Sequence, residues 1–168
     1  MRLPALIAAT GLTVALAACN TTGTIPAPGE SASSGSPAAV ADYDWFFHES
    51  GTVARLAYGL EESDDLRIGL DCTKNTGVVS LSAVAPTGAA HEIHLESGGE
   101  TERYSAEAQP SEINDGLFLS ADAKTGDPVF QRFRRVGWLA VWEGGERHAY
   151  APHPGSAPRI ERFFAFCG

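Results

Sequence analysis

Apolar and polar residues alternate strictly from residue 66 to residue 72, the clearest strand pattern in the chain. Successive side chains of a strand point to opposite faces of its sheet. One face would carry Leu66, Ile68, Leu70 and Cys72, and the other Arg67, Gly69 and Asp71. The pattern therefore predicts a strand whose apolar face ends in a thiol.

Shorter stretches of the same alternation, separated by turn-forming residues, lie on both sides of this segment. They cover residues 52–58, 78–85, 92–96, 104–108, 117–119, 138–142 and 147–151. Before the last of them, Gly144 and Gly145 predict a type I′ hairpin turn, because glycine tolerates the positive φ angles that this turn requires. An aromatic cluster at residues 43–48 marks the expected beginning of the core.

Two segments near the end of the chain show helical spacing instead. Asp127 as N-cap, Pro128 at the first helical position and Gly137 just past the end predict a short helix. A second helix is predicted over residues 158–167, with one apolar stripe made of Ile160, Phe163, Phe164 and Cys167. The predicted fold is mainly β: an antiparallel β-sandwich-like domain with a short helix near residue 130 and a C-terminal helix.

The first part of the chain has the composition of an export signal followed by a linker. In residues 1–18, Arg2 precedes an apolar run and no acidic residue occurs, which is typical of a signal peptide. Residues 19–41 are rich in Thr, Ser, Gly, Pro and Ala, so a flexible tether is expected there. Residues 42–168 would then form a single β-rich globular domain.

The end of the predicted signal peptide carries a more specific pattern. Leu16-Ala17-Ala18-Cys19 resembles the lipobox of bacterial lipoproteins at all four positions. That resemblance implies that Cys19 is lipidated and becomes the mature N-terminus. The alternative is an ordinary secretory leader with a chance cysteine. Asn20 stands where Asp would signal inner-membrane retention, so the resemblance implies a lipid anchor at the outer membrane, facing the periplasm.

The chain has three cysteines, and lipidation of Cys19 would leave an even pair in an oxidising compartment. Cys72 and Cys167 are both predicted on core faces, one at the end of a strand and one at the end of a helix. We therefore expect a disulfide between them. The alternative is two separate buried thiols. No Cys-x-x-Cys redox motif occurs, so the pair would be structural.

The formal net charge of -9 argues against nucleic acid as a partner, because phosphate binding needs a basic surface. The charge is also unevenly distributed. Residues 132–168 hold six arginines and three glutamates, whereas residues 19–131 hold five basic and eighteen acidic residues. We expect the C-terminal part to pack against the acidic part and partly neutralise it. A dedicated acidic binding face is the alternative.

No segment of the sequence predicts a catalytic, cofactor or metal site. His91-Glu92-Ile93-His94 has one residue where the helical zinc motif needs two, and on a strand its histidines would point to opposite faces. His148 and His153 are expected to be solvated loop residues. Ser156 is expected to cap the last helix. The carboxylates of the 59–65 turn, at Glu61, Glu62, Asp64 and Asp65, are expected to be solvated as well.

Trp45, Cys72, the pair Phe163-Phe164 and Cys167 resemble small exported bacterial domains of uncharacterised function, some associated with secretion systems. This resemblance carries no catalytic residue. The leading hypothesis is a non-enzymatic envelope lipoprotein that binds a protein or glycan partner. One alternative is an acidic inhibitor or immunity protein against a basic hydrolase such as lysozyme. The other is an envelope hydrolase whose site is assembled from distant residues.

Overall fold

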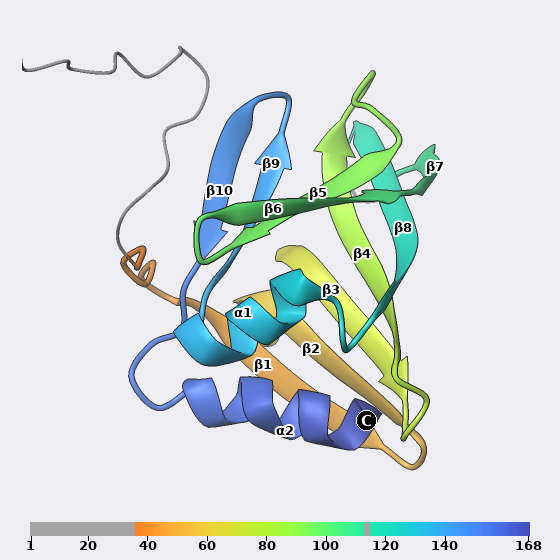
Figure 1. Cartoon of the computed structure of the whole chain (residues 1–168). Coiled ribbons are helices and arrows are strands. Elements are labelled where there is room, and N and C mark those ends of the chain that lie inside the picture. Colours follow the sequence, from red (N-terminus) through yellow and green to blue (C-terminus); the bar gives the residue numbers. More distant parts are fainter. Residues whose placement is uncertain (1–35, 113–114) are drawn as a thin grey trace, which may run out of the picture. The chain divides into compact units, whose positions relative to one another are not determined.

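The computed structural model describes residues 36–112 and 115–168. The predicted signal peptide, Cys19 and most of the predicted tether lie outside the described residues. The described residues form ten strands and two helices in two antiparallel sheets (Figure 1). The predicted fold class is confirmed: a mainly β, sandwich-like arrangement with a short helix near residue 130 and a C-terminal helix.

The larger sheet has six strands in the order β1-β2-β3-β4-β8-β7. Their bounds are β1 Tyr43–Ser50, β2 Val53–Leu60, β3 Leu66–Thr73, β4 Val78–Pro86, β8 Gly116–Lys124 and β7 Glu107–Pro110. The smaller sheet has the order β10-β9-β5-β6, with β10 Glu146–Tyr150, β9 Leu139–Glu143, β5 Glu92–Ser97 and β6 Glu100–Ser105. The β9–β10 turn has φ 59° at Gly144 and 91° at Gly145, as predicted.

The core lies between the inner face of the larger sheet and a layer made of the two helices and the smaller sheet. Helix α1 (Pro128–Val136) packs on β5 and β6, and α2 (Ala157–Cys167) packs on β1 and β2 (Figure 1). The largest side chains that are fully buried there include Trp45, Tyr58, Phe130, Phe133, Phe163, Leu56, Leu70, Leu81 and Leu95. Alternation along the strands thus buries one face of each sheet.

Two strands are longer or more regular than their sequence patterns predict. The aromatic segment at 43–48 is an edge strand, β1, paired with β2 along its whole length. The strand expected at 117–119 runs on to Lys124, because Ala121 and Ala123 continue its buried face. Alanine gives a weak apolar signal, so the second half of this strand was missed.

The predicted strand at 104–108 is in fact divided between the two sheets. Strand β6 ends at Ser105 in the smaller sheet, and β7 begins at Glu107 in the larger one. Ala106 is the only residue between them, and its N–H donates to the carbonyl of His91 at 3.0 Å. The chain therefore passes from one sheet to the other without a loop.

The C-terminal end of α2 is fastened to the end of β3. Cys72 and Cys167 form a disulfide, in agreement with the predicted pairing, and their Cα atoms are 5.7 Å apart. In the β3–β4 turn, the N–H groups of Asn75 and Gly77 donate to the carbonyls of Phe166 and Cys167 at 3.1 and 2.9 Å. These bonds satisfy helix-end carbonyls that have no partner within the helix.

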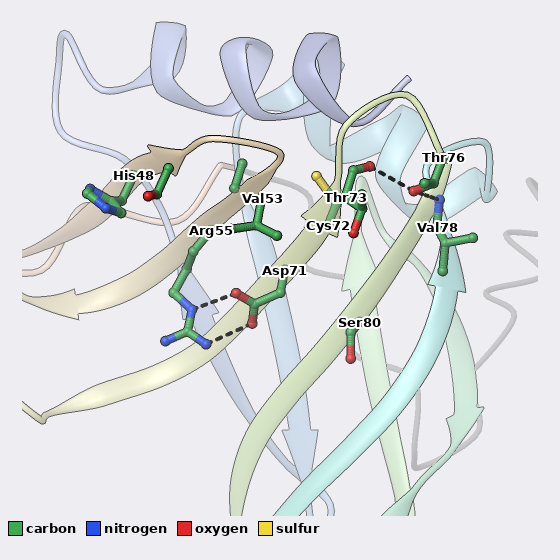
Figure 2. Close-up of a pocket in the computed structure, with 11 residues that line it drawn as sticks. His48, Val53, Arg55, Asp71, Cys72, Thr73, Thr76, Val78 and Ser80 are labelled. Atoms are coloured by element: carbon green, nitrogen blue, oxygen red, sulfur yellow. Dashed lines mark hydrogen bonds and ion pairs between the residues drawn. The ribbon is translucent and has the colours of Figure 1, made fainter.

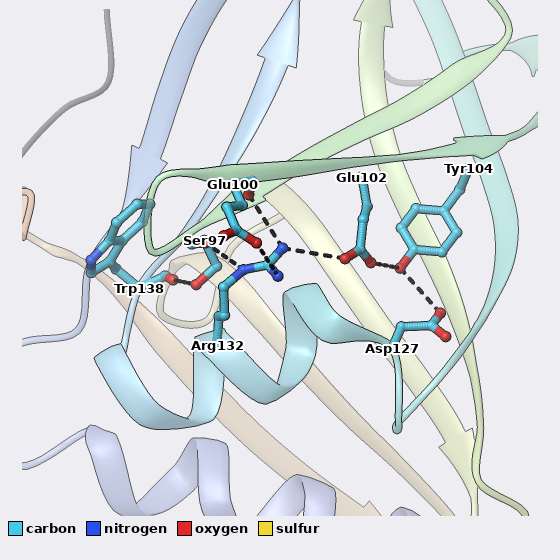
Figure 3. Close-up of polar contacts among 7 residues, drawn as sticks. All are labelled: Ser97, Glu100, Glu102, Tyr104, Asp127, Arg132 and Trp138. Carbon is cyan, nitrogen blue, oxygen red and sulfur yellow. Dashed lines mark hydrogen bonds and ion pairs between the residues drawn. The ribbon is translucent and has the colours of Figure 1, made fainter.

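A buried arginine fastens α1 to the β5–β6 hairpin. The Arg132 side chain is 11% exposed and donates to the Ser97 carbonyl at 2.8 Å, Glu100 at 3.0 Å and Glu102 at 3.2 Å (Figure 3). The Tyr104 hydroxyl lies 3.1 Å from carboxylate oxygens of both Glu102 and Asp127.

This network engages the predicted N-cap residue of α1. Asp127 occupies the N-cap position, but its carboxylate accepts from the Lys124 N–H and the Tyr104 hydroxyl and makes no cap bond. Burial, followed by the charges of Asp127 and Glu102, raises the pKa of the Tyr104 hydroxyl, so this group stays protonated. Every polar group of the network has a partner within the fold, which is typical of a structural cluster.

We expect Cys72→Ala to lower the free energy of unfolding by roughly 2 to 4 kcal/mol, because the bridge restricts the unfolded chain. Urea denaturation measures the effect, and reduction of the unaltered protein should give a loss of the same size. Two alkylatable thiols in the folded, unreduced protein would contradict the bridge.

We expect Arg132→Ala to lower the free energy of unfolding by about 2 kcal/mol, since it removes the guanidinium that donates to the Ser97 carbonyl and to one oxygen of Glu102. Arg134→Ala on the same helix is the matched control. Its ion pair with Glu161 is exposed, so a loss of at most about 1 kcal/mol is expected. Equal losses in urea denaturation would show that the Arg132 network has no special role.

Candidate functional site

The side of the six-stranded sheet that points away from the helices and the smaller sheet is here called the outer face. Most of its side chains are the polar or small members of each alternating pair, and a few are large and apolar. They include His48, Val53, Arg55, Ala57, Arg67, Gly69, Asp71, Val78, Ser80, Ser82, Phe118 and Ser120. Strand pairing brings these residues, far apart in sequence, into one surface.

Small residues form a row across the middle of the outer face. Ala57 is paired with Gly69, Gly69 with Ser82, and Ser82 with Ser120. A Cβ atom added at Gly69 would lie 2.6 Å from the Ser82 hydroxyl, so no larger residue fits there without a shift. The row is a low floor between taller side chains on either side.

Two open hollows lie on this face, and Arg55 lines both of them. The first has a volume of about 540 Å³ and is lined by His48, Ser50, Val53, Ala54, Arg55, Asp71, Cys72, Thr73, Thr76, Val78 and Ser80 (Figure 2). The second has a volume of about 650 Å³, and its lining includes Arg55, Asp64, Asp65, Arg67, Gly69, Ser82, Val84, Gln109, Glu112 and Phe118. The shared arginine makes them adjoining parts of one recess.

In the first hollow, both carboxylate oxygens of Asp71 accept hydrogen bonds from Arg55. Arg55 donates from Nε and Nη2 to the two oxygens of Asp71, at 2.7 and 3.0 Å (Figure 2). The hydrogen bond to Asp71 raises the pKa of the Arg55 guanidinium. Because both Asp71 oxygens accept from Arg55, this carboxylate is poorly placed to act as a base, and the pair is suited to orienting a ligand.

The second hollow contains part of the acidic turn that was expected to be solvated. The Asp65 side chain is 39% exposed, and it also accepts from the Tyr43 hydroxyl and pairs with Arg67 at 3.2 Å. Arg67 also donates to the Tyr43 hydroxyl at 2.9 Å. Asp64 and Glu112 add further carboxylates to the lining. This end of the recess is therefore acidic, and Arg67 holds Asp65 and the Tyr43 hydroxyl in place.

Exposed apolar side chains are concentrated on the outer face. Among the described residues, the large hydrophobic side chains that are exposed are Val53 at 52%, Val78 at 46%, Phe118 at 44% and Val40 at 48%. Val53 and Val78 line the first hollow and Phe118 the second. Apolar side chains gathered at a recess indicate a contact surface more often than singly scattered ones do.

Ser156, Asp44 and His153 lie close together but do not form a catalytic relay. Ser156 is buried, and its hydroxyl donates to Asp44. Its oxygen accepts no hydrogen bond from the N–H groups of the helix N-terminus, so the predicted cap bond is absent. His153 gives its backbone N–H to Asp44 at 3.2 Å, while its ring nitrogen Nε2 lies 2.8 Å from the Val40 carbonyl. These contacts tie β1 to the segment before α2. Nε2 of His153 is held by the Val40 carbonyl and not by the serine, so the three residues are not linked in the order of a Ser-His-Asp triad.

The outward side of the smaller sheet carries a row of planar side chains. Pairing brings Arg103 beside His94, His94 beside Trp142 and Trp142 beside Arg147. The rings of His94 and Trp142 are stacked with centroids 5.9 Å apart. Glu96, only 4% exposed, accepts from Trp142 at 2.7 Å and from Arg147 at 2.8 and 3.1 Å. The row is thus held by internal contacts.

The histidines named from the sequence fall in separate places. His94 points outward from β5, whereas Ile93 beside it is buried in the core. His148 lies in β10 and not in a loop. Within residues 36–112 and 115–168, no group of three or more His, Cys, Asp or Glu side chains is arranged to hold a metal ion.

Comparison of the chain with protein-family models, with curated proteins and with solved structures finds no match. Neither helix of the described residues has the length and apolar character needed to cross a membrane.

We expect the stability of the fold to decrease as the pH falls below about 6.5, through His94. Burial, reinforced by Arg103, lowers the pKa of His94 below its ordinary value of 6.5, and its Nε2 is buried with no hydrogen-bond partner among the described residues. The unfolded chain then binds the proton more tightly, so acid favours unfolding until the pH is below the folded-state pKa.

Urea denaturation between pH 7 and about pH 5 measures this slope. His94→Phe keeps a ring against Trp142 and removes the titrating group, so it should flatten the slope. His91→Gln, at an exposed histidine before β5, is the control. An unchanged slope in His94→Phe would contradict the role of His94.

Proposed function

We propose that this chain is a non-enzymatic envelope lipoprotein whose β-rich domain binds a protein or glycan partner on the outer face. The observation that carries the proposal is the double recess. It places two adjoining hollows, an ordered Arg55–Asp71 pair and three exposed apolar side chains on one surface. Apolar contacts and organised charges together are what a specific interface needs.

The composition of the recess favours a protein over a glycan as the partner. Phe118 is the aromatic side chain in the lining of the two hollows, and valines provide the other exposed apolar contacts. A surface with aliphatic side chains around ion pairs resembles the core and rim of a protein interface. The small-residue floor would admit side chains of a partner between the taller residues.

The envelope location is supported by the sequence at residues 16–19 and by the disulfide. Leu16-Ala17-Ala18-Cys19 matches the lipobox pattern, and a structural disulfide is stable in an oxidising compartment such as the periplasm. Lipidation of Cys19 would keep the domain at a membrane surface. A Cys19→Ser protein that still partitioned into detergent like the processed wild type would rule out this anchor.

One observation favours a second candidate, an acidic inhibitor of a basic hydrolase. Asp64, Asp65 and Glu112 line the larger hollow against Arg55 and Arg67, which leaves this end of the recess with an excess of negative charge. Such a surface would attract a basic enzyme by electrostatic complementarity. A lysozyme activity assay tests this candidate, and inhibition that disappears at high salt would support it.

We expect Val78→Glu and Phe118→Glu each to weaken partner binding by roughly tenfold or more, because each buries a charge in place of an apolar contact. A photoreactive amino acid at Ser80, exposed on β4 in the first hollow, would capture the partner in intact cells. The yield of the captured complex is the measurement. Val40→Glu, at an exposed valine that lines neither hollow, is the matched control.

Capture that is lost in both recess variants and kept in Val40→Glu is the expected result. Equal capture from all three proteins, or a crosslinked species that forms only from positions on the helices, would contradict the outer face as the binding surface.

A further inference from the structure

The exposed sides of the two helices, with Lys74 beside the end of α2, carry a positive charge that contrasts with the rest of the chain. This helical face holds Lys74, Arg134, Arg135, Arg159 and Arg162, and its one acidic residue within the helices is Glu161. The whole chain has a formal net charge of -9. The acidic domain therefore has one locally basic side.

Four of these five cations lie over phenylalanine rings. The distances from cation to ring centroid are 5.3 Å for Lys74 over Phe166, 5.6 Å for Arg134 over Phe164, 5.5 Å for Arg159 over Phe46 and 4.9 Å for Arg162 over Phe47. A guanidinium stacked on a ring keeps its N–H groups available at its edge, and this geometry suits phosphate oxygens.

Three of the five cations have no ion pair among the described residues. Arg134 pairs with Glu161 at 3.0 Å and Arg159 with Asp44 at 3.2 Å. Lys74, Arg135 and Arg162 form no ion pair within residues 36–112 and 115–168, and Arg135 and Arg162 are exposed. An exposed set of unpaired cations has charge left for an external anion.

The helical face points away from the recess. Helix α2 packs on β1 and β2 at the inner face of the six-stranded sheet (Figure 1). Both hollows lie on the outer face. No residue of either helix lines the hollows described above. The helical face therefore carries positive charge spread over its surface and lines neither hollow. Such a surface suits an extended anionic partner better than a small ligand.

We propose that the helical face docks on an anionic lipid surface, with Lys74, Arg135 and Arg162 against phosphate groups of the lipids. The proposal rests on the envelope location put forward above. Docking in this orientation would direct the recess away from the membrane, toward a partner. The attraction is electrostatic, so it should weaken as salt is added.

The experiment uses the full chain, as processed by the cell, reconstituted with vesicles of phosphatidylcholine alone or with added phosphatidylglycerol. A photoreactive amino acid is placed at Ala165 on the helical face, or at Ser80 on the outer face for comparison. Crosslinking to tagged lipid reports which face meets the bilayer. Sedimentation with the phosphatidylcholine vesicles reports the anchor separately.

We expect lipid crosslinking from Ala165, only with phosphatidylglycerol and at low salt, and little from Ser80. Arg135→Gln combined with Arg162→Gln should lower the docking equilibrium constant roughly 30-fold, at about fivefold per cation near an anionic surface. Arg55→Gln combined with Arg103→Gln removes the same charge from other sides of the domain and should leave docking unchanged.

The results that would overturn docking differ from the result that would overturn the lipid anchor. Equal crosslinking from Ala165 and Ser80, equal yields with and without phosphatidylglycerol, or equal effects of the two double variants would overturn the docking proposal. Failure to sediment with phosphatidylcholine vesicles would overturn the lipid anchor instead. In that case the binding of the soluble chain to phosphatidylglycerol vesicles, compared between the same variants, still decides whether the helical face docks.

Discussion

The attachment of the last helix to the end of β3 is the constraint on which the arrangement of this domain depends. Helix α2 has 11 residues, too few to be stable alone in water, and it forms through burial of its apolar stripe. The disulfide and the two hydrogen bonds from the β3–β4 turn hold its C-terminal end in place. With α2 seated, the β1 and β2 part of the inner face is covered, and α1 and the smaller sheet complete the layer.

The elements that sequence reasoning located best are those with a strong local signal. The alternation at 66–72, the Gly144-Gly145 turn and the Pro128-to-Gly137 boundaries of α1 each appear in the structure where they were expected. The second half of β8 was missed because alanines carry its buried face. The division between β6 and β7 was missed because a strand that changes sheets keeps the same alternation across the junction.

The candidate site was predictable in part. Alternation correctly assigned Arg67, Gly69 and Asp71 to the face opposite the core, but their neighbours across the sheet depend on strand order and register, which one sequence does not specify. The pairing of Arg55 with Asp71 and the row from Ala57 to Ser120 are products of that register. The predicted cap at Ser156 failed for a similar reason, since the hydroxyl is directed toward Asp44, a residue distant in sequence, and makes no cap bond.

The direct passage from β6 to β7 at Ala106 links the larger hollow to the network around Arg132. Gln109 and Pro110 of β7 line the larger hollow, and Glu102 and Tyr104 of β6 belong to the network around Arg132. One continuous length of extended backbone joins them, with a single residue between the two strands. Because no loop lies between them to absorb a displacement, a movement of β7 would be transmitted along the chain to the residues that seat α1.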